Sequence, residues 1–328
     1  MKDLKTSTKR GILLDGVLFG CENERMRKCG SADTSATDAL TQSRTNAILI
    51  AITGIHGNFY SNPFYYTVGD TLTASGYDFL YAQACDAFGT IRTPNTRTGQ
   101  TELIGSWNER FAYAEEDVAA WIDWAERHGY RHIYLAGHSL GANKVIYYLS
   151  RTHDPRVEHF LLLSPANLDY MTSGVTAAER DYVRRAYEAG RGAEMLPFPL
   201  MGWVECTVAT AYDWLHSGLL NNVHSSKSHQ TCLNGRVVKD EDEVNVHTHP
   251  DGDFGQLERI IHTGALLIGT YDNFTDGDPA GFLRLINSHL PTAAENRLVF
   301  IERTGHTYQM KHQELADNIL ELLKDWKI

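Results

Sequence analysis

The sequence predicts an α/β fold, in which a mainly parallel β-sheet carries helices on both of its faces. Short, continuous apolar runs alternate along the chain with longer segments whose apolar residues recur every three or four positions. The run 47–52 is apolar at every position, as expected of a strand that is buried on both faces. Regular alternation of such strands with helices is typical of a parallel sheet with helical connections.

The predicted elements follow one another in order from residue 46. Strands are predicted at residues 47–52, 78–82, 132–136, 160–163, 265–268 and 298–301. Helices are predicted from Pro63 to about Gly76 and over the apolar stripes Val118–Ala125, Ala142–Leu149 and Leu315–Trp326. Gly129 stands just beyond the second helix, where a glycine favours a helix end.

The N-terminal segment allows two interpretations. Lys9 and Arg10 precede a short apolar run that ends at Cys21, an arrangement that faintly resembles an export signal with a lipoprotein cysteine. However, Asp15 and three glycines interrupt this run. We therefore expect a first β-strand with a turn in this part of the chain.

The regular alternation stops between residues 168 and 258. A capping box at Thr176–Glu179 predicts a helix that ends near Gly190, and a polar segment rich in His and Asp follows further on. We expect a core domain formed by residues 1–167 and 259–328, with residues 168–258 inserted as a partly helical lid. The lid aromatics, Trp203, Tyr212 and Trp214, fit either a substrate pocket or the lid's own core.

Composition excludes several classes of protein. The 328 residues carry a formal net charge of -11, which disfavours nucleic-acid binding, and no apolar run is long enough to span a membrane. The five cysteines are odd in number, widely spaced and without a CxxC pair, so neither a disulfide framework nor a structural zinc site is expected. We expect mostly reduced thiols and a cytoplasmic protein.

The motif Gly137-His138-Ser139-Leu140-Gly141 directly follows a predicted strand and opens a predicted helix. A sharp turn between strand and helix lifts the central serine above the sheet, and the flanking glycines relieve crowding. The start of the helix also offers free N–H groups to a developing negative charge. This context identifies Ser139 as a candidate nucleophile.

A serine nucleophile needs a base and a carboxylate that orients the base. His306 follows the last predicted strand and is preferred over His312, which lies at the start of the final helix. Asp272 follows the next-to-last strand most closely, while Asp276 and Asp278 remain competitors that could instead form turns.

The oxyanion of the reaction also needs donors. The N–H of Leu140, just after the nucleophile, is one candidate. The second should come from the loop 54–60, where Gly57 permits close approach and the Asn58 N–H is the candidate donor. Phe59 and Tyr60 beside it, and His138 in the motif, are candidate substrate contacts.

Taken together, these positions resemble the α/β-hydrolase superfamily of esterase-, lipase- and thioesterase-like serine hydrolases, over residues 54 to 306. The resemblance implies an eight-stranded, mostly parallel sheet, no cofactor and a covalent acyl-enzyme on Ser139. The loop His56-Gly57-Asn58 resembles that of haloalkane dehalogenases, but those enzymes carry an aspartate where this chain has Ser139. The His-Gly-Gly-Gly loop of some lipases is absent.

The expected function is hydrolysis of a carboxylic ester of a small or medium hydrophobic molecule. A thioesterase, amidase or acyltransferase would use the same residues. A non-catalytic hydrolase-like binding protein is the alternative from another class.

The segment His247–Asp253 has the alternation of a metal-binding cluster, but it lacks further ligands, so we expect a solvated loop and no metal. The sequence does not fix an oligomeric state.

Overall fold

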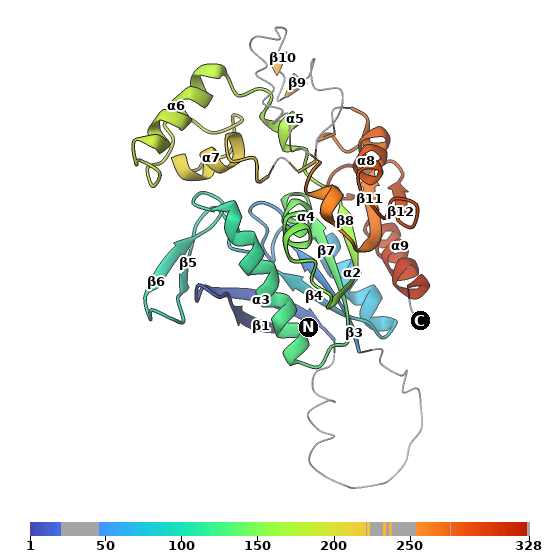
Figure 1. Ribbon diagram of the computed structural model, residues 1–328. Coiled ribbons are helices and arrows are strands. Elements are labelled where there is room, and N and C mark those ends of the chain that lie inside the picture. The colour runs from blue at the N-terminus through green and yellow to red at the C-terminus, as the bar shows by residue number, and fades with distance from the viewer. Residues whose placement is uncertain are drawn as a thin grey trace, which may run out of the picture.

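An eight-stranded sheet forms the centre of the molecule (Figure 1). The computed structural model describes residues 1–20, 46–220, 222–223, 232–233, 236–237, 254–275 and 277–326. The strand order of the sheet is β1-β2-β4-β3-β7-β8-β11-β12. Strand β2 pairs antiparallel with β1 and β4, and the remaining neighbours pair in parallel. The predicted fold class is therefore confirmed.

The six strands predicted from residue 46 onward are all present, and the expected N-terminal strand is β2. The strands of the sheet are β1 (Lys2–Ser7), β2 (Leu13–Phe19), β3 (Ala47–Ile52), β4 (Asp78–Ala82), β7 (His132–His138), β8 (Val157–Leu163), β11 (Thr263–Gly269) and β12 (Arg297–Ile301). Two short hairpins, β5 (Ile91–Pro94) with β6 (Thr101–Ile104) and β9 (Cys232–Leu233) with β10 (Arg236–Val237), lie outside it.

The four predicted core helices are confirmed, and α8 was not predicted. The helices of the core are α2 (Phe64–Ala74), α3 (Ala114–Arg127), α4 (Leu140–Thr152), α8 (Pro279–Ser288) and α9 (His312–Asp325), with single 3-10 turns η1 (Phe111–Tyr113) and η2 (Leu257–Arg259). Helix α8 has ten residues, too few to give a long apolar stripe.

Alternate residues of β3 pack on opposite faces of the sheet. Ile48, Ile50 and Ile52 join a core with residues of α3, α4 and α8. Leu49 and Ala51 point the other way, into a core formed with α2 and α9. Burial on both faces explains why this strand is apolar at every position, and Figure 1 shows the two helix layers.

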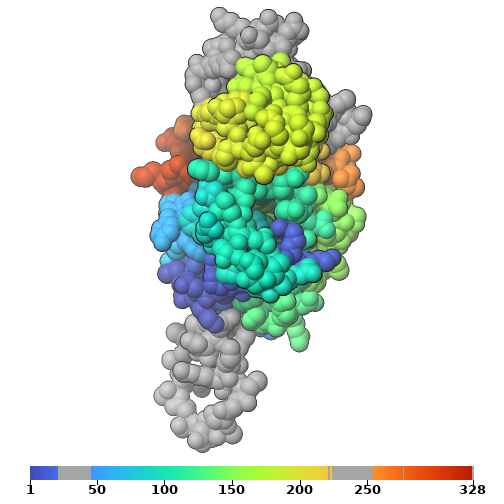
Figure 2. Space-filling view, turned by 90° about the vertical axis from the view of Figure 1, so that its left-hand side faces the viewer, coloured from blue at the N-terminus to red at the C-terminus, as the bar shows by residue number. Residues whose placement is uncertain are grey.

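The connection between β8 and β11, residues 164–262, carries α5 (Leu168–Thr172), α6 (Ala177–Glu188) and α7 (Val208–Leu215). The predicted capping box is present, since Thr176 and Glu179 bond reciprocally. These helices share a third apolar cluster with Leu140, at the start of α4, and Phe111. They lie above the sheet in Figure 1, and in Figure 2 the atoms of α6 and α7 meet the β5–β6 hairpin on one face.

Candidate active site

Ser139 occupies the sharp turn between β7 and α4. Its backbone has φ 55° and ψ −127°, a strained conformation for a residue with a side chain. Two glycines make this turn fit: a Cβ on Gly137 would lie 2.2 Å from the carbonyl oxygen of Gly141, and one on Gly141 would lie 2.3 Å from that of Ile52. The packed turn explains the need for glycine two residues before and after the serine.

His306 and Asp272 meet at the ends of two neighbouring strands. Asp272 follows β11 and His306 follows β12, and the two strands pair in parallel. The His306 Nδ1 atom lies 2.9 Å from Asp272 Oδ2; the His306 side chain is 12% exposed and that of Asp272 is 1% exposed. The imidazole therefore keeps some access to solvent while its carboxylate partner is sealed.

Asp272 is held as an anion in spite of its burial. Burial alone would raise the pKa of Asp272, but the charge of His306 and hydrogen bonds from His306 and the Phe274 N–H lower it. The Phe274 N–H donates to Asp272 Oδ1 at 3.0 Å. Both carboxylate oxygens thus have donors, and the carboxylate can orient an imidazole and stabilise its protonated form.

The alternative triad residues lie elsewhere. Asp278 is the N-cap of α8, where its Oδ1 accepts from the Gly281 N–H at 2.9 Å. Asp276 lies outside the described residues. His312 is the first residue of α9, and its ring lies 6.3 Å from that of Phe64. The structure thus brings His306 together with Asp272, the pair that strand order favoured.

The oxyanion loop corrects one sequence-based expectation. The Asn58 N–H donates to Ser61 Oγ at 3.0 Å, and the Asn58 side-chain amide donates to the His56 carbonyl at 2.8 Å, so both groups serve the loop itself. The residue that approaches the nucleophile is Gly54, where a Cβ would lie 2.9 Å from Ser139 Cβ. Asn58 therefore lies four residues beyond Gly54, the residue that contacts Ser139.

A tight turn exposes a different N–H beside the serine. The Gly57 N–H donates to the Gly54 carbonyl at 2.9 Å, and His56 takes φ 58°. Ile55 is the second residue of this turn, a position whose N–H points away from the turn. Among the residues that the structure describes, no acceptor contacts the Ile55 N–H. Ile55 thus offers the free donor that was expected at Asn58.

Solved structures of known proteins share this architecture. Est1E from Butyrivibrio proteoclasticus is similar with a TM-score of 0.53 and 15% identity, over 99% of this chain and 98% of that one. The α/β hydrolase GrgF from Penicillium sp. has a TM-score of 0.57 and 14% identity, over 99% and 98%. The chain has the α/β-hydrolase fold.

A third similar structure is a soluble variant of monoglyceride lipase from Saccharomyces cerevisiae, in complex with a substrate analogue. Its TM-score is 0.59 at 10% identity, over 98% of this chain and 94% of that one. No protein-family model matches the sequence. A comparison with curated protein sequences likewise finds no match.

The distance from the end of β3 is a signal in the sequence for the position of the free Ile55 N–H. Strand β3 ends at Ile52, and the chain then has only two residues before Ile55. The conspicuous His56-Gly57 pair drew the expectation to Asn58. Counting from the end of the apolar run would have selected the Gly54–Ile55 peptide instead.

The three expected substrate contacts have different surroundings. His138 is 2% exposed and its Nε2 lies 2.8 Å from the His306 carbonyl oxygen, so it does not face a substrate. Phe59 packs edge-on against Tyr81, with ring centroids 5.2 Å apart. Tyr60 is 91% exposed. Of the three, Tyr60 alone presents its whole side chain to solvent, and the role of Phe59 and Tyr60 toward substrate stays a prediction.

Other expectations concern metals and cysteines. Within the described residues, no group of three His, Cys, Asp or Glu side chains is arranged to hold a metal ion. The segment His247–Asp253 lies outside these residues, as do Cys21 and Cys29. Cys85 and Cys206 are buried free thiols. The described helices include none long and apolar enough to cross a membrane.

A groove of about 880 Å³ lies away from the triad. Its walls come from the β5–β6 hairpin, the segment that follows it, and the α6–α7 region, on the face seen in Figure 2. Trp107, Arg110 and Tyr187 line it, whereas Ser139 and His306 do not. The groove is therefore distinct from the Ser139 turn and the His306–Asp272 pair.

Proposed function

We propose that this protein is a serine hydrolase of carboxylic esters, with Ser139 as nucleophile, His306 as base and Asp272 as the orienting acid. The observation that carries the proposal is the combination of a strained serine at a strand–helix turn with a largely buried His–Asp pair. The pair is tied to this turn because the His306 carbonyl accepts from His138, the residue directly before the serine. The same combination on this fold serves acyl transfer to a serine hydroxyl. Structurally similar proteins named esterase and monoglyceride lipase support the reaction class.

The proposed reaction proceeds in two halves. His306 Nε2 accepts the Ser139 Oγ proton as Oγ bonds to the ester carbonyl carbon, and the carbonyl oxygen becomes an anion. When the tetrahedral intermediate collapses, the C–O bond to the alcohol breaks and His306 returns the proton to the leaving oxygen. Water then attacks the acyl-enzyme, giving its proton to His306 and releasing the carboxylic acid and free Ser139.

We infer that the Leu140 and Ile55 N–H groups bind the oxyanion. Leu140 N belongs to the first turn of α4, where N–H groups have no partner within the helix. Gly54 brings the preceding loop against Ser139, and the free Ile55 N–H follows it. A preorganised donor of this kind contributes about 3–4 kcal/mol of transition-state stabilisation.

The surroundings favour an apolar substrate. Leu140, Ile55 and Phe274 belong to the apolar cluster that α5 and α7 complete above the catalytic turn. Trp203 from the same connection contacts the His56 ring, with centroids 6.3 Å apart. We propose that residues 168–258 form a cap over this site and that residues 1–167 and 259–328 form the core. A small or medium hydrophobic ester suits such walls.

The direct test compares hydrolysis of p-nitrophenyl acetate and butyrate by the wild-type protein and by Ser139→Ala. Loss of the nucleophile should lower kcat by about 10⁴–10⁶-fold. Ser150→Ala is the matched control, because Ser150 lies on α4, the helix that Ser139 precedes, and among the described residues its hydroxyl bonds only the Tyr147 carbonyl. Wild-type turnover that Ser139→Ala retains would contradict the assignment of the nucleophile.

A fluorophosphonate probe separates the remaining alternatives. Labelling of Ser139 with no turnover of either ester would favour a thioester, amide or acyl-transfer substrate, which a panel of those bonds would then identify. Absence of both labelling and turnover would favour a non-catalytic binding protein with this fold.

A further inference from the structure

His138 makes a single, well-defined polar contact through its ring. Its Nε2 lies 2.8 Å from the backbone carbonyl oxygen of His306. A carbonyl oxygen can only accept a hydrogen bond, so His138 Nε2 must carry the proton and donate it. A neutral imidazole then has no proton on Nδ1, and the buried Nδ1 of His138 has no partner among the described residues.

Aromatic rings hold His138 in this orientation. The Phe64 ring meets it edge-on with centroids 5.0 Å apart, and the Tyr308 ring lies 6.2 Å away. Tyr308 is itself fixed, because its hydroxyl donates to the Leu267 carbonyl at 3.1 Å and accepts from Ser164 Oγ at 3.0 Å. The donor atom of His138 therefore has one direction available to it.

Burial also keeps His138 neutral. Burial first, and the neighbouring His306 second, lower the pKa of His138 to about 3. Protonation of His138 would require it to lose this environment, so the ring keeps the same donor across the pH range in which esterases are assayed.

The segment that carries His306 has no regular secondary structure to position it. Residues 302–311 form neither helix nor strand, and Arg303, Tyr308 and Met310 all have positive φ. The ring of His306 is held by Asp272, as described above. Its backbone carbonyl is held by His138, the residue directly before the nucleophile.

We propose that His138 is a positioning residue for catalysis: its Nε2–H holds the backbone of His306 at a fixed distance from Ser139. This inference rests on the proposed function. Asp272 sets the rotation of the His306 ring, and His138 sets where that ring stands. Displacement of a catalytic group by about 1 Å can cost about 100-fold in rate.

Two amide variants provide a matched test. The Nε2 of Gln in His138→Gln reaches the place of the imidazole Nε2, whereas the amide in His138→Asn is one methylene too short. We expect His138→Gln to keep kcat within about 3-fold and His138→Asn to lower kcat by about 10- to 100-fold. KM should change little in both, since neither variant alters a surface that faces the substrate.

A second readout does not depend on turnover. The proton between His306 Nδ1 and Asp272 gives a far-downfield proton NMR signal when the pair is ordered. This signal should persist in His138→Gln and shift or broaden in His138→Asn, while the melting temperatures of the two variants stay alike. Equal kcat and equal signals in both variants would overturn the proposal, and so would equal losses in both.

Measurements on the wild-type protein cover the case in which a variant does not fold. With ¹⁵N-labelled histidine, His138 should show a protonated Nε2 and an unprotonated Nδ1 from pH 5 to pH 8. The opposite tautomer would overturn the proposal. A wild-type protein with this tautomer, an ordered His306–Asp272 signal and no reaction at Ser139 would instead refute the proposed function alone.

Discussion

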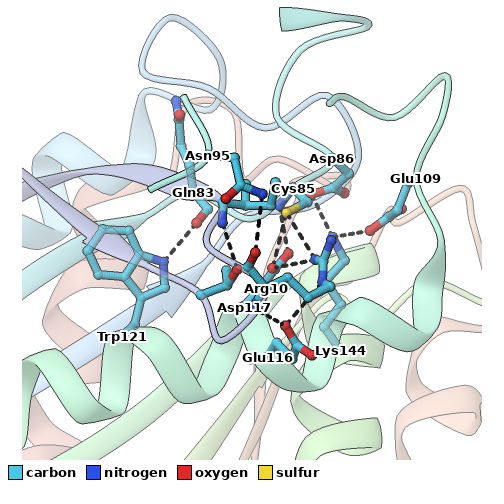
Figure 3. A network of polar contacts seen from close by, with 12 residues as sticks. Arg10, Gln83, Cys85, Asp86, Asn95, Glu109, Glu116, Asp117, Trp121 and Lys144 are labelled. Atoms are coloured by element: carbon cyan, nitrogen blue, oxygen red, sulfur yellow. Dashed lines mark hydrogen bonds and ion pairs between the residues drawn. The ribbon is translucent and has the colours of Figure 1, made fainter. Parts of the chain in front are cut away.

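Two buried polar clusters contact α4, and they are built on opposite principles. The first, called the catalytic cluster after its proposed role, comprises Ser139, His138, His306 and Asp272; hydrogen bonds join His306 to Asp272 and to His138, and the His306 ring stays partly open to solvent. The second, called the charge cluster, comprises Arg10, Asp86, Glu109, Glu116, Asp117 and Lys144 (Figure 3). In the charge cluster, Asp86, Glu109, Asp117 and Lys144 are almost completely buried. Arg10 and Glu116 lie at its edge, with 25% and 28% of their side chains exposed.

The centre of the charge cluster is Lys144, which is fully buried on α4, five residues beyond Ser139. Its Nζ lies 2.5 Å from Asp86 Oδ1 and 2.7 Å from Glu109 Oε1, and both carboxylates are also buried. Burial would lower the pKa of Lys144, but Asp86 and Glu109 outweigh it and raise that pKa. The ammonium is therefore charged, and it stabilises the buried carboxyl groups of Asp86 and Glu109, which could not be buried without a cation.

The charge cluster also links the core to the β8–β11 connection. The Thr210 hydroxyl, on α7, donates to the Glu109 carbonyl at 2.9 Å. The next residue, Arg110, forms two hydrogen bonds of 2.9 Å with Asp213 of α7. Helix α4 thus begins at the catalytic cluster, and further along it Lys144 pairs with Glu109, whose backbone carbonyl and whose neighbour Arg110 bond to α7.

The largest predicted effect concerns the catalytic cluster. Asp272→Asn should lower kcat for ester hydrolysis by about 10⁴-fold, because an amide stabilises the wrong tautomer of His306 and cannot balance its positive charge. Folding stability should change far less than activity. Steady-state kinetics with p-nitrophenyl butyrate and thermal melting measure the two effects.

Asp278→Asn is the matched control for this prediction. Asp278 caps α8, and asparagine caps helices about as well as aspartate, so this variant should keep both activity and stability. The reverse outcome, with activity lost in Asp278→Asn and kept in Asp272→Asn, would show that the orienting acid is wrongly assigned.

The second predicted effect is a loss of folding stability in the charge cluster. Lys144→Met keeps the aliphatic stem but leaves Asp86 and Glu109 buried without a cation, and we expect it to lower the free energy of unfolding by about 3–5 kcal/mol. Urea denaturation at pH 7 measures the loss. Lys5→Met, which removes a lysine paired with Asp15 at the surface, should cost about 1 kcal/mol or less.

The outcome also tests how the charge cluster is balanced. The loss in Lys144→Met should shrink at pH 5, where the orphaned carboxylates can take up protons. If Lys144→Met were as stable as the wild type at pH 7, the ammonium would not be what holds these carboxylates together.

The sequence predicts the catalytic cluster because its members are tied to strand ends. Continuous apolar runs locate strands buried on both faces, and parallel pairing brings the residues after β11 and β12 to one edge. Ser139, Asp272 and His306 each follow such a run. Position in the strand order, rather than residue type, selected His306 from 15 histidines.

The charge cluster has no comparable signal. Its residues come from five separate parts of the chain, before β2, after β4, before α3, on α3 and on α4. Each charge, taken singly, reads as a surface residue, because lysine, aspartate and glutamate are seldom fully buried. Lys144 lies off the predicted apolar stripe of this helix, where a surface residue is expected, and only the tertiary fold supplies the partners that allow it to be buried.

The error at Asn58 has a local cause. The turn Gly54–Gly57 and the bond between the Asn58 N–H and Ser61 Oγ redirect the loop within a few residues. His138 was misassigned because its neighbours along the chain do not reveal that it is buried against Phe64. Both details depend on side chains that meet only after the loops have folded.

The smallest predicted effect is a pH dependence of folding stability that comes from Glu109 in the charge cluster. Burial and the nearby Asp86 raise the pKa of Glu109 to about 7, although Lys144 opposes them, from an ordinary value of about 4.5. Between these values the folded protein holds a proton that the unfolded chain releases. Stability from this group is therefore complete below about pH 4.5 and is lost as the pH rises through 7, at up to about 1.4 kcal/mol per pH unit.

Glu109→Gln removes this titration while keeping the shape of the side chain. The variant should match the wild type near pH 4, where Glu109 is protonated in both the folded and the unfolded chain, and exceed its free energy of unfolding by on the order of 2–3 kcal/mol at pH 8. Urea denaturation across this range measures the difference, and the comparison near pH 4 is the internal control. If the free energies of unfolding of the wild type and of Glu109→Gln changed in parallel with pH, the pKa of Glu109 would not be raised in the folded protein. Lys144 would then offset the effect of burial on Glu109 completely.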